Sequence, residues 1–225
     1  MSLKKKKLER LNIANKLILI EMKTIDNFEL FKSVMNFNND DEFYFVQILV
    51  RGKDGHNEPG INGNNKNRLI KFYTVKSVEQ LEKLKPEIIS ICETTNARAY
   101  IHPTKRSFAG VADECLHTTI ETYLSNKMGL KNVYSTACGK SYISKDKKFV
   151  VDLDEEDVLK ETKIVEYIEY HCEPFNVVKL QYKVPTVHGV HLITSAFNTE
   201  KFGLEFPEIS VHKNNPTLLY YKPLV

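Results

Sequence analysis

Short runs of aromatic and β-branched residues alternate with segments of helical apolar spacing along most of this 225-residue chain. Such runs predict β-strands where turn residues bound them, and apolar residues three and four apart predict amphipathic helices. In the first half, the pattern predicts strands over residues 42–51, 68–74 and 97–102, the first two antiparallel, and helices over residues 77–94 and 107–127, with a further short helix opening at Asn27.

Local signals refine several of these elements. Ser77 and Gln80 form a capping box, which places the start of a helix at Ser77. Pro86 lies inside the same helical pattern and predicts a kink or two short helices, because proline lacks the N–H that a helix interior needs. Residues 4–38 are partly amphipathic with helical spacing, and the Gly- and Asn-rich residues 52–67 predict a flexible loop.

The second half of the chain has a simpler order of elements. The pattern predicts β-α-β-β-α-β, which is the order of ferredoxin-like and RNA-recognition-like units. The predicted strands cover residues 148–153, 177–184, 190–194, 209–212 and 217–221, and the predicted helices cover residues 155–170 and 199–202. We therefore expect an α/β (α+β) chain with an N-terminal helical segment (1–38), an α/β lobe (39–130) and an RNA-recognition-like lobe (131–225), packed as one bilobal domain.

Composition places the chain among ordinary globular proteins, with 42% hydrophobic and 27% charged residues. The net charge of +3 provides no strong overall attraction to nucleic acid, although local basic patches remain open. The apolar run at residues 17–20 is too short to span a bilayer, and no signal peptide or membrane partner is expected. Four irregularly spaced cysteines without a C-x-x-C pair indicate reduced thiols and a cytoplasmic location.

Two acids at the end of one predicted strand are the first candidates for chemistry. Asp152 and Asp154 are two residues apart, so on a strand their side chains point to the same face. Two adjacent carboxylates repel each other and resist ionisation unless a cation lies between them. Oxygen ligands of this kind suit Mg²⁺ or Mn²⁺, which bridge to substrate phosphates. The pair therefore predicts metal-assisted phosphoryl chemistry.

Two further segments follow the acid pair in a fixed order. The three segments are Val150-Val151-Asp152-Leu153-Asp154, Gly189-Val190-His191-Leu192-Ile193 and Glu208-Ile209-Ser210-Val211-His212-Lys213-Asn214-Asn215. Their order resembles the archaeo-eukaryotic primase superfamily, in particular its primase-polymerase branch. That family has a strand ending in D-x-D/E, a strand with S-x-H, and an acid shortly before V-Y-x-x-N. Here glycine replaces the serine, Glu208 replaces aspartate and His212 replaces tyrosine.

The resemblance covers the chain from about residue 40 onward and implies a metal-dependent nucleotidyltransferase that adds nucleotides on a nucleic-acid template. It implies that Asp152, Asp154 and Glu208 are catalytic and bind two divalent ions, Mg²⁺ or Mn²⁺. It also implies that His191, Lys213 and Arg98 bind the nucleotide. The partners implied are nucleoside triphosphates, single-stranded or primed nucleic acid, and other replication proteins.

Each of these residues has a simpler interpretation as well. Asp152 and Asp154 could cap the helix that follows them, since acids favour the first turn. His191 could be an ordinary core histidine or, together with His188, a ligand of a transition metal. Glu208 could be an exposed acid without a role.

The alternatives to the polymerase hypothesis follow from these interpretations. One is a nuclease or another phosphotransferase that uses the same metal site. The other is a catalytically degenerate relative that binds nucleic acid or a replication partner, which the weak overall charge favours. The basic run at residues 4–7 is either a solvated tail or a nucleic-acid arm, and Lys105 and Arg106 are either solvated or contacts to a phosphate backbone.

Overall fold

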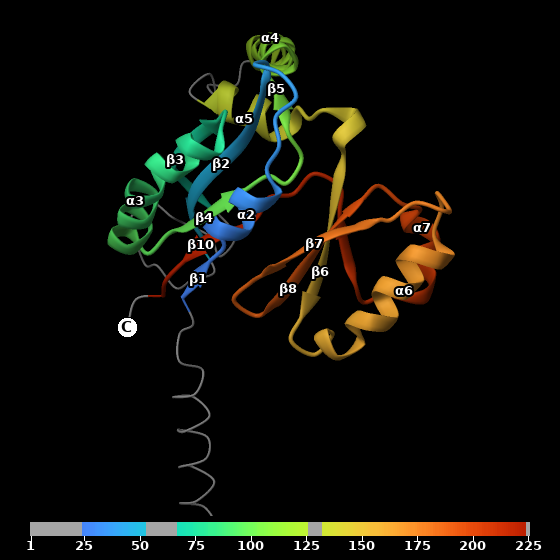
Figure 1. Cartoon of the computed structure of the whole chain (residues 1–225). Helices are drawn as coiled ribbons and strands as arrows, with labels where there is room; N and C mark the ends of the chain where they lie inside the picture. Colours follow the sequence, from blue (N-terminus) through green and yellow to red (C-terminus); the bar gives the residue numbers. More distant parts are fainter. Residues whose placement is uncertain (1–23, 53–66, 126–131, 224–225) are drawn as a thin grey trace, which may run out of the picture.

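A computed structural model describes residues 24–52, 67–125 and 132–223 of the chain. The predicted fold class is confirmed, because the described residues form six α-helices and two antiparallel sheets (Figure 1). Each sheet belongs to one lobe, and the two lobes share part of one hydrophobic core. The expected helix over the first part of residues 4–38 and most of the expected loop at 52–67 lie outside the described residues.

The first lobe is built around β2, a nine-residue strand in which seven of the nine residues are buried. The predicted strands at 42–51, 68–74 and 97–102 are all confirmed, and the first two are antiparallel. The sheet has the order β1 (Ile25–Asp26), β10 (Thr217–Tyr221), β4 (Arg98–Ile101), β2 (Glu42–Val50) and β3 (Arg68–Val75), with β5 (Arg106–Ser107) also paired to β2.

Four helices accompany this sheet: α2 (Phe28–Val34), α3 (Val78–Thr95), α4 (Phe108–Leu124) and α5 (Val133–Lys140). The capping prediction for α3 is confirmed, because the Ser77 hydroxyl accepts a hydrogen bond from the backbone N–H of Gln80. Of the two outcomes expected at Pro86, a kink or two short helices, the second is excluded, because α3 is one helix from Val78 to Thr95. Pro86 and Glu82 are both exposed, so water can satisfy the Glu82 carbonyl that a residue with an N–H at position 86 would have bonded.

The second lobe confirms the predicted order of elements. Its sheet has the order β7 (Leu180–Pro185), β8 (Gly189–Ser195), β6 (Lys148–Asp154) and β9 (Ser210–His212), so β8 lies between β6 and β7. The helices are α6 (Glu161–His171) and α7 (Thr199–Glu205), with short 3₁₀ turns η3 (Ser144–Asp146) and η4 (Val158–Lys160). The helix expected from residue 155 therefore begins later, after a turn and η4.

Three elements belong to a different part of the molecule than expected. The strand at 217–221 was expected to complete the second unit, but β10 is the neighbour of β4 in the first sheet, and all its residues are buried. Residues 25–26 form β1 beside β10, within the segment expected to be helical. Helix α5 contributes Ala137 and Cys138 to a core of the first lobe, although residue 131 was the expected boundary.

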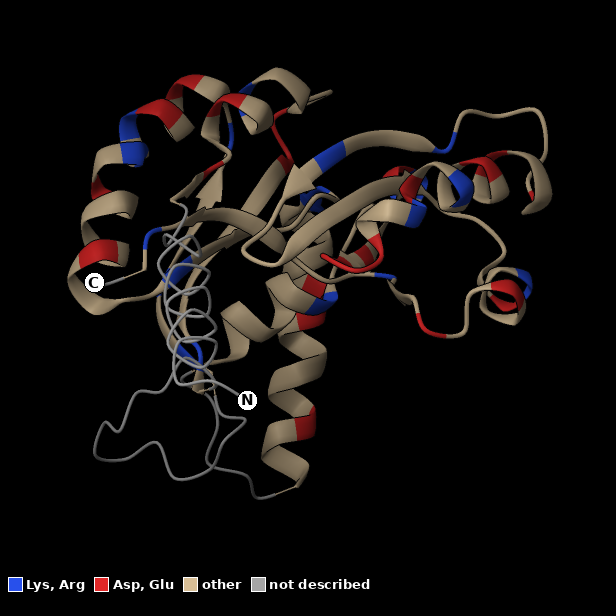
Figure 2. Ribbon diagram, turned by 90° about the horizontal axis from the view of Figure 1, so that it is seen from below, with Lys and Arg blue, Asp and Glu red and all other residues tan. Residues whose placement is uncertain are grey.

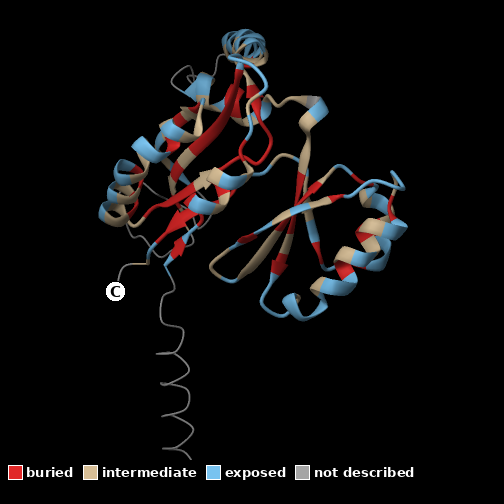
Figure 3. Cartoon of the chain, viewed as in Figure 1, coloured by how far each residue is buried: buried red, intermediate tan, exposed pale blue. Residues whose placement is uncertain are grey.

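The two faces of β6 pack against different parts of the molecule. Phe149, Val151 and Leu153 pack with α6 and α7, which cover the outer face of the second sheet. Val150, from the other face, belongs to the core that the second sheet shares with the first lobe. Because side chains alternate along a strand, Asp152 and Asp154 lie on the same face as Val150, toward the first lobe. Figure 3 shows buried residues along β6 where the two lobes meet.

Candidate functional site

Strand β6 carries the acid pair between its two neighbours. Asp152 lies directly opposite His191 of β8 and Ser210 of β9, and Asp154 lies opposite Gly189 of β8. Directly opposed residues of an antiparallel pair point to the same face of the sheet. The pairing therefore brings the first two motifs together, side by side, on the face that points toward the first lobe.

Gly189 is required by the close approach of β8 to the end of β6. A Cβ atom at this position would lie 1.9 Å from the Leu153 carbonyl oxygen and 3.0 Å from the Asp154 Cα atom. Both obstacles are backbone atoms, which cannot move aside as a flexible side chain can. Glycine at this point of the second motif therefore allows β8 to begin beside Asp154, two residues before His191.

His191 connects the acid pair to the first lobe. Its Nε2 atom is 3.1 Å from Asp152 Oδ1, and its Nδ1 atom is 2.7 Å from Thr217 Oγ1. Thr217 is fully buried at the start of β10, in the first sheet. The contact joins the two sheets through one imidazole ring.

The partners of the His191 ring select one tautomer of its neutral form. An ionised carboxylate only accepts hydrogen bonds, so Nε2 must carry the proton that it donates to Asp152. In the neutral ring, Nδ1 is then an acceptor, and the Thr217 hydroxyl donates to it. The N–H of Nε2 is consequently held on the side of the ring where Asp152 lies.

The surroundings of Asp152 favour its ionised form. The hydrogen bond from His191 lowers the pKa of the Asp152 carboxyl, and electrostatic interactions with His191, His212 and Arg51 act in the same direction. Together these effects exceed the opposing effect of partial burial. His212 and Arg51 were not among the expected site residues; Arg51 follows β2 directly, and only the fold brings it near β6.

The structure does not bring Glu208 to the acid pair. Glu208 precedes β9 in a turn, and its Oε1 atom is 3.1 Å from the Nζ atom of Lys160 in η4. The β9 residue opposite Asp152 is Ser210, and the one opposite Val150 is His212. The strand beside β6 therefore has a hydroxyl and an imidazole at these positions, where the resemblance implies a third carboxylate nearby.

The two expected cationic groups lie in different places. Lys213 follows β9 and is exposed, with its Nζ atom 6.0 Å from the centre of the Phe149 ring. Arg98 is buried in β4, and its guanidinium carbon lies 4.3 Å from the centre of the Tyr221 ring. Arg98 thus forms a cation–π contact within the first lobe, where its planar group fits the aromatic face.

Lys105 and Arg106 are neither solvated nor exposed to a phosphate backbone, contrary to both expectations. Arg106 is fully buried and donates hydrogen bonds to His102 Nδ1 (2.7 Å) and Asn214 Oδ1 (2.8 Å). Lys105 Nζ is 2.6 Å from Glu42 Oε2. Asn214, from the third motif, therefore helps to hold the second lobe against the first.

The acid pair fits part of a Mg²⁺ or Mn²⁺ site. Asp152 and Asp154 present oxygen donors on one face, and Mg²⁺ is usually held by one or two carboxylates together with substrate phosphates. Within residues 24–52, 67–125 and 132–223, no three His, Cys, Asp or Glu side chains are grouped so as to hold a metal ion. A site formed by this arrangement would therefore need oxygen atoms from the substrate.

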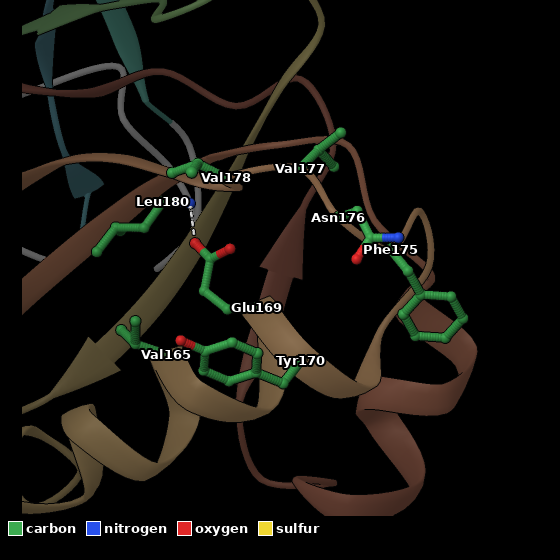
Figure 4. A pocket seen from close by; sticks show the side chains of 8 residues that line it. All are labelled: Val165, Glu169, Tyr170, Phe175, Asn176, Val177, Val178 and Leu180. Atoms are coloured by element: carbon green, nitrogen blue, oxygen red, sulfur yellow. Dashed lines mark hydrogen bonds between the residues drawn. The ribbon is translucent and has the colours of Figure 1, made fainter.

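A hollow of about 530 Å³ lies elsewhere in the second lobe, between α6 and the segment that leads into β7 (Figure 4). Apolar side chains form most of its lining, and Glu169 is its one acid. The Glu169 carboxylate accepts hydrogen bonds from the backbone N–H groups of Lys179 and Leu180. Because this acid serves to hold the chain before β7, we do not assign chemistry to the hollow.

Comparisons with protein-family models, with curated proteins and with solved structures found no match for this chain. In the described part of the chain, no helix is long and apolar enough to cross a membrane. The four cysteines are free thiols, and three of them are buried.

The tautomer of His191 provides a direct test of the site geometry. Replacing Thr217 by Val removes the hydroxyl at nearly constant volume and leaves Nδ1 without its donor. We expect the single Nε2–H tautomer to give way to a mixture, and the free energy of unfolding to fall by about 1–3 kcal/mol. Nitrogen-15 NMR of the imidazole measures the tautomer. Thr217→Ser should retain it, and an unchanged tautomer in Thr217→Val would show that Asp152 alone orients the ring.

Proposed function

We propose that this protein is a metal-dependent nucleotidyltransferase that resembles primase-polymerases and adds nucleotides on a nucleic-acid template. The supporting observation is the pairing of Asp152 with His191 on adjacent strands, on the sheet face that points toward the other lobe. The motifs lie in separate parts of the sequence, and the fold brings two of them into direct contact. The strand order of the second sheet, β7-β8-β6-β9, supports the same proposal, because it is the order of an RNA-recognition-like unit.

In this proposal the acid pair binds the cation that accompanies the nucleotide. The cation, Mg²⁺ or Mn²⁺, would neutralise charge on the triphosphate and on the attacking oxygen. The lowered pKa of Asp152 favours its carboxylate form still further, so this side chain can accept a cation. Asp154 lies on the same face and is exposed.

His191 would contribute a hydrogen-bond donor to the same substrate. Its Nε2–H points toward Asp152, and a phosphate oxygen is an alternative acceptor for that donor. Thr217 would keep the ring in place while the Nε2–H changes its acceptor from Asp152 to the phosphate oxygen. Lys213, which is exposed after β9, remains a proposed contact to the triphosphate, whereas Arg98 is buried against Tyr221 and is not part of this proposal. The catalysis would consist mainly of positioning and charge neutralisation.

One observation favours a second candidate function. The third expected ligand, Glu208, is held in an ion pair with Lys160, and Lys160 also lies 3.3 Å from Asp157. A relative that has lost catalysis would tolerate such a pair, because it needs no third carboxylate at the metal. The second candidate is therefore a nucleic-acid-binding or replication-partner-binding protein of the same fold.

Nucleotide binding can be tested without an assay of catalysis. Mn²⁺ with a nucleoside triphosphate is expected to raise the melting temperature, because a ligand present at about 100 times its Kd stabilises the native state by about 2.7 kcal/mol. The double variant Asp152→Asn with Asp154→Asn should lose this increase. Glu156→Gln, an exposed acid two residues further along, is the matched control and should retain it. An equal increase in the double variant would place the nucleotide elsewhere.

A further inference from the structure

A basic segment lies where the chain passes from the first lobe into the second. Residues 140–148 read KSYISKDKK, with four lysines and one acid. The segment connects α5 to β6 through η3, at the junction of the two lobes in Figure 1. Elsewhere the charges are mixed, and Figure 2 shows Lys and Arg interspersed with Asp and Glu along the chain. The local excess of positive charge therefore distinguishes this segment from the rest of the surface.

Two of the four lysines are neutralised by nearby acids. Lys140 Nζ lies 3.1 Å from a carboxylate of α4, and Lys148 Nζ lies 2.8 Å from Asp146 Oδ1. Lys145 is exposed and Lys147 is half-buried, and neither forms an ion pair with another residue that the structure describes. These two positive charges are therefore available to an anionic partner.

Two aromatic rings accompany the available lysines. Lys147 Nζ lies 5.1 Å from the centre of the Tyr142 ring and 5.5 Å from the centre of the Phe149 ring, which are cation–π distances. Lys213 Nζ lies 6.0 Å from the centre of the same Phe149 ring. The Tyr142 ring is half-buried, so part of it faces solvent, whereas Phe149 is buried. Lys213, the proposed contact to the triphosphate, thus lies at the border of this cluster.

The backbone of the segment is held against the first lobe. The Ile143 N–H donates a hydrogen bond to the Lys105 carbonyl oxygen (3.0 Å), and the Lys148 N–H donates one to Thr104 Oγ1 (2.9 Å). The side chains between these points therefore project from a fixed backbone. A ligand bound here would need to order side chains only, which lowers the entropic cost of binding.

The chemistry of the cluster fits a single strand of nucleic acid. Lysines neutralise phosphates and release counterions, and a ring that is open to solvent can stack on an unpaired base. A duplex offers the phosphates but keeps its bases stacked on one another. Helix α4, on the other side of Lys140, contains Asp113, Glu114 and Glu121 but no Lys or Arg, so it disfavours a polyanion there.

We propose that Lys145, Lys147 and Tyr142 bind the single-stranded template, with the lysines on phosphates and the tyrosine ring against a base. The inference rests on the proposed function in calling this strand a template. Phe149 and Asp152 are three residues apart on β6, which is roughly 10 Å. Because they lie on opposite faces of the sheet, the strand passes the short edge strand β9 to reach the acid pair.

Strand binding can be measured on the full-length chain without nucleotides or metal. The probe is a labelled oligothymidine of about 12 nucleotides, a usual site size for such surfaces, and the readout is fluorescence anisotropy. Lys145→Gln with Lys147→Gln should weaken binding by about tenfold and reduce the slope of log K against log salt by about 0.7 for each lost phosphate contact. Lys83→Gln removes the charge of an exposed lysine in α3 and should change neither quantity.

The tyrosine gives a separate readout. Tyr142→Ala should weaken oligothymidine binding by roughly tenfold, an effect typical of the loss of one stacked base. The salt slope should not change, because stacking releases no counterions. Tyr142→Phe keeps the ring and should retain the binding. Melting temperatures show that each variant is folded.

Absence of strand binding by the unaltered chain overturns the inference, and so does binding that the lysine pair leaves intact. Binding that depends on the lysines but not on Tyr142 would indicate a general polyanion surface and would also contradict it. These outcomes are independent of catalysis. Nucleotide incorporation together with unaffected strand binding in the variants would refute only this inference, whereas binding that depends on the cluster without incorporation would support it and refute the nucleotidyltransferase.

Discussion

Replacing Asp152 by Asn is expected to lower nucleotide incorporation by a factor of about 10²–10³, the size of effect that follows the loss of one preorganised electrostatic group. The amide keeps the shape of the side chain but removes the charge that would bind the cation. It also disturbs the bond to His191 Nε2, because an amide has one acceptor oxygen where the carboxylate has two. Incorporation of labelled nucleotides on a primed template, at saturating Mn²⁺, measures the effect.

Two controls show whether the loss arises at the site. Glu156→Gln removes an exposed acid from the same segment and should retain full incorporation. The melting temperature of Asp152→Asn without ligands should show that the variant is folded. Full incorporation by folded Asp152→Asn would mean that the acid pair has only a local structural role, at the start of the turn before α6, and takes no part in catalysis.

Replacing Gly189 by Ala is expected to destabilise the protein by about 3 kcal/mol, the upper end of the range for overpacking in a packed interior. The new Cβ would lie 1.9 Å from the Leu153 carbonyl oxygen, so β8 must move away from β6. A loss of this size lowers the melting temperature of a domain with 150–250 residues by roughly 6–12 °C. Thermal unfolding followed by circular dichroism provides the measurement.

Gly203 offers a matched control for that substitution. It lies in α7, and a Cβ atom there would meet no atom within 4 Å. Gly203→Ala should therefore stabilise the protein by about 0.5–1 kcal/mol, because alanine favours a helix interior more than glycine does. If Gly189→Ala proved as stable as Gly203→Ala, β8 would not begin against the end of β6.

Much of the fold could be predicted because the local signals agree with the final structure. The dense apolar pattern of residues 42–50 specifies a buried central strand, and the hydroxyl of Ser77 caps α3 as its spacing with Gln80 predicts. The pairing of Asp152 with His191 follows from the same local pattern, since β6 and β8 are neighbours in the predicted type of unit.

Pairings between strands and side chains that are far apart in the sequence could not be predicted in this way. Strand β10 has the apolar character of any buried strand, and its pattern does not indicate whether it pairs with β9 or with β4. The Glu208 side chain points toward Lys160, with which it forms an ion pair, and Lys160 is 48 residues away in the sequence. The role of Thr217 could not be predicted, because a lone threonine at the start of a strand does not indicate its partner. Only the fold brings Thr217 of β10 within hydrogen-bond distance of His191 in β8.

The most direct test of the central claim is whether the unaltered protein incorporates nucleotides at the Asp152–His191 site. Purified full-length protein is incubated with a primed single strand, labelled nucleoside triphosphates and Mn²⁺ or Mg²⁺, and strand binding is measured on the same sample. We expect primer extension that requires the metal and that Asp152→Asn and His191→Ala strongly reduce while strand binding persists. Strand binding without incorporation in either metal would contradict the proposal of a nucleotidyltransferase and favour the non-catalytic relative.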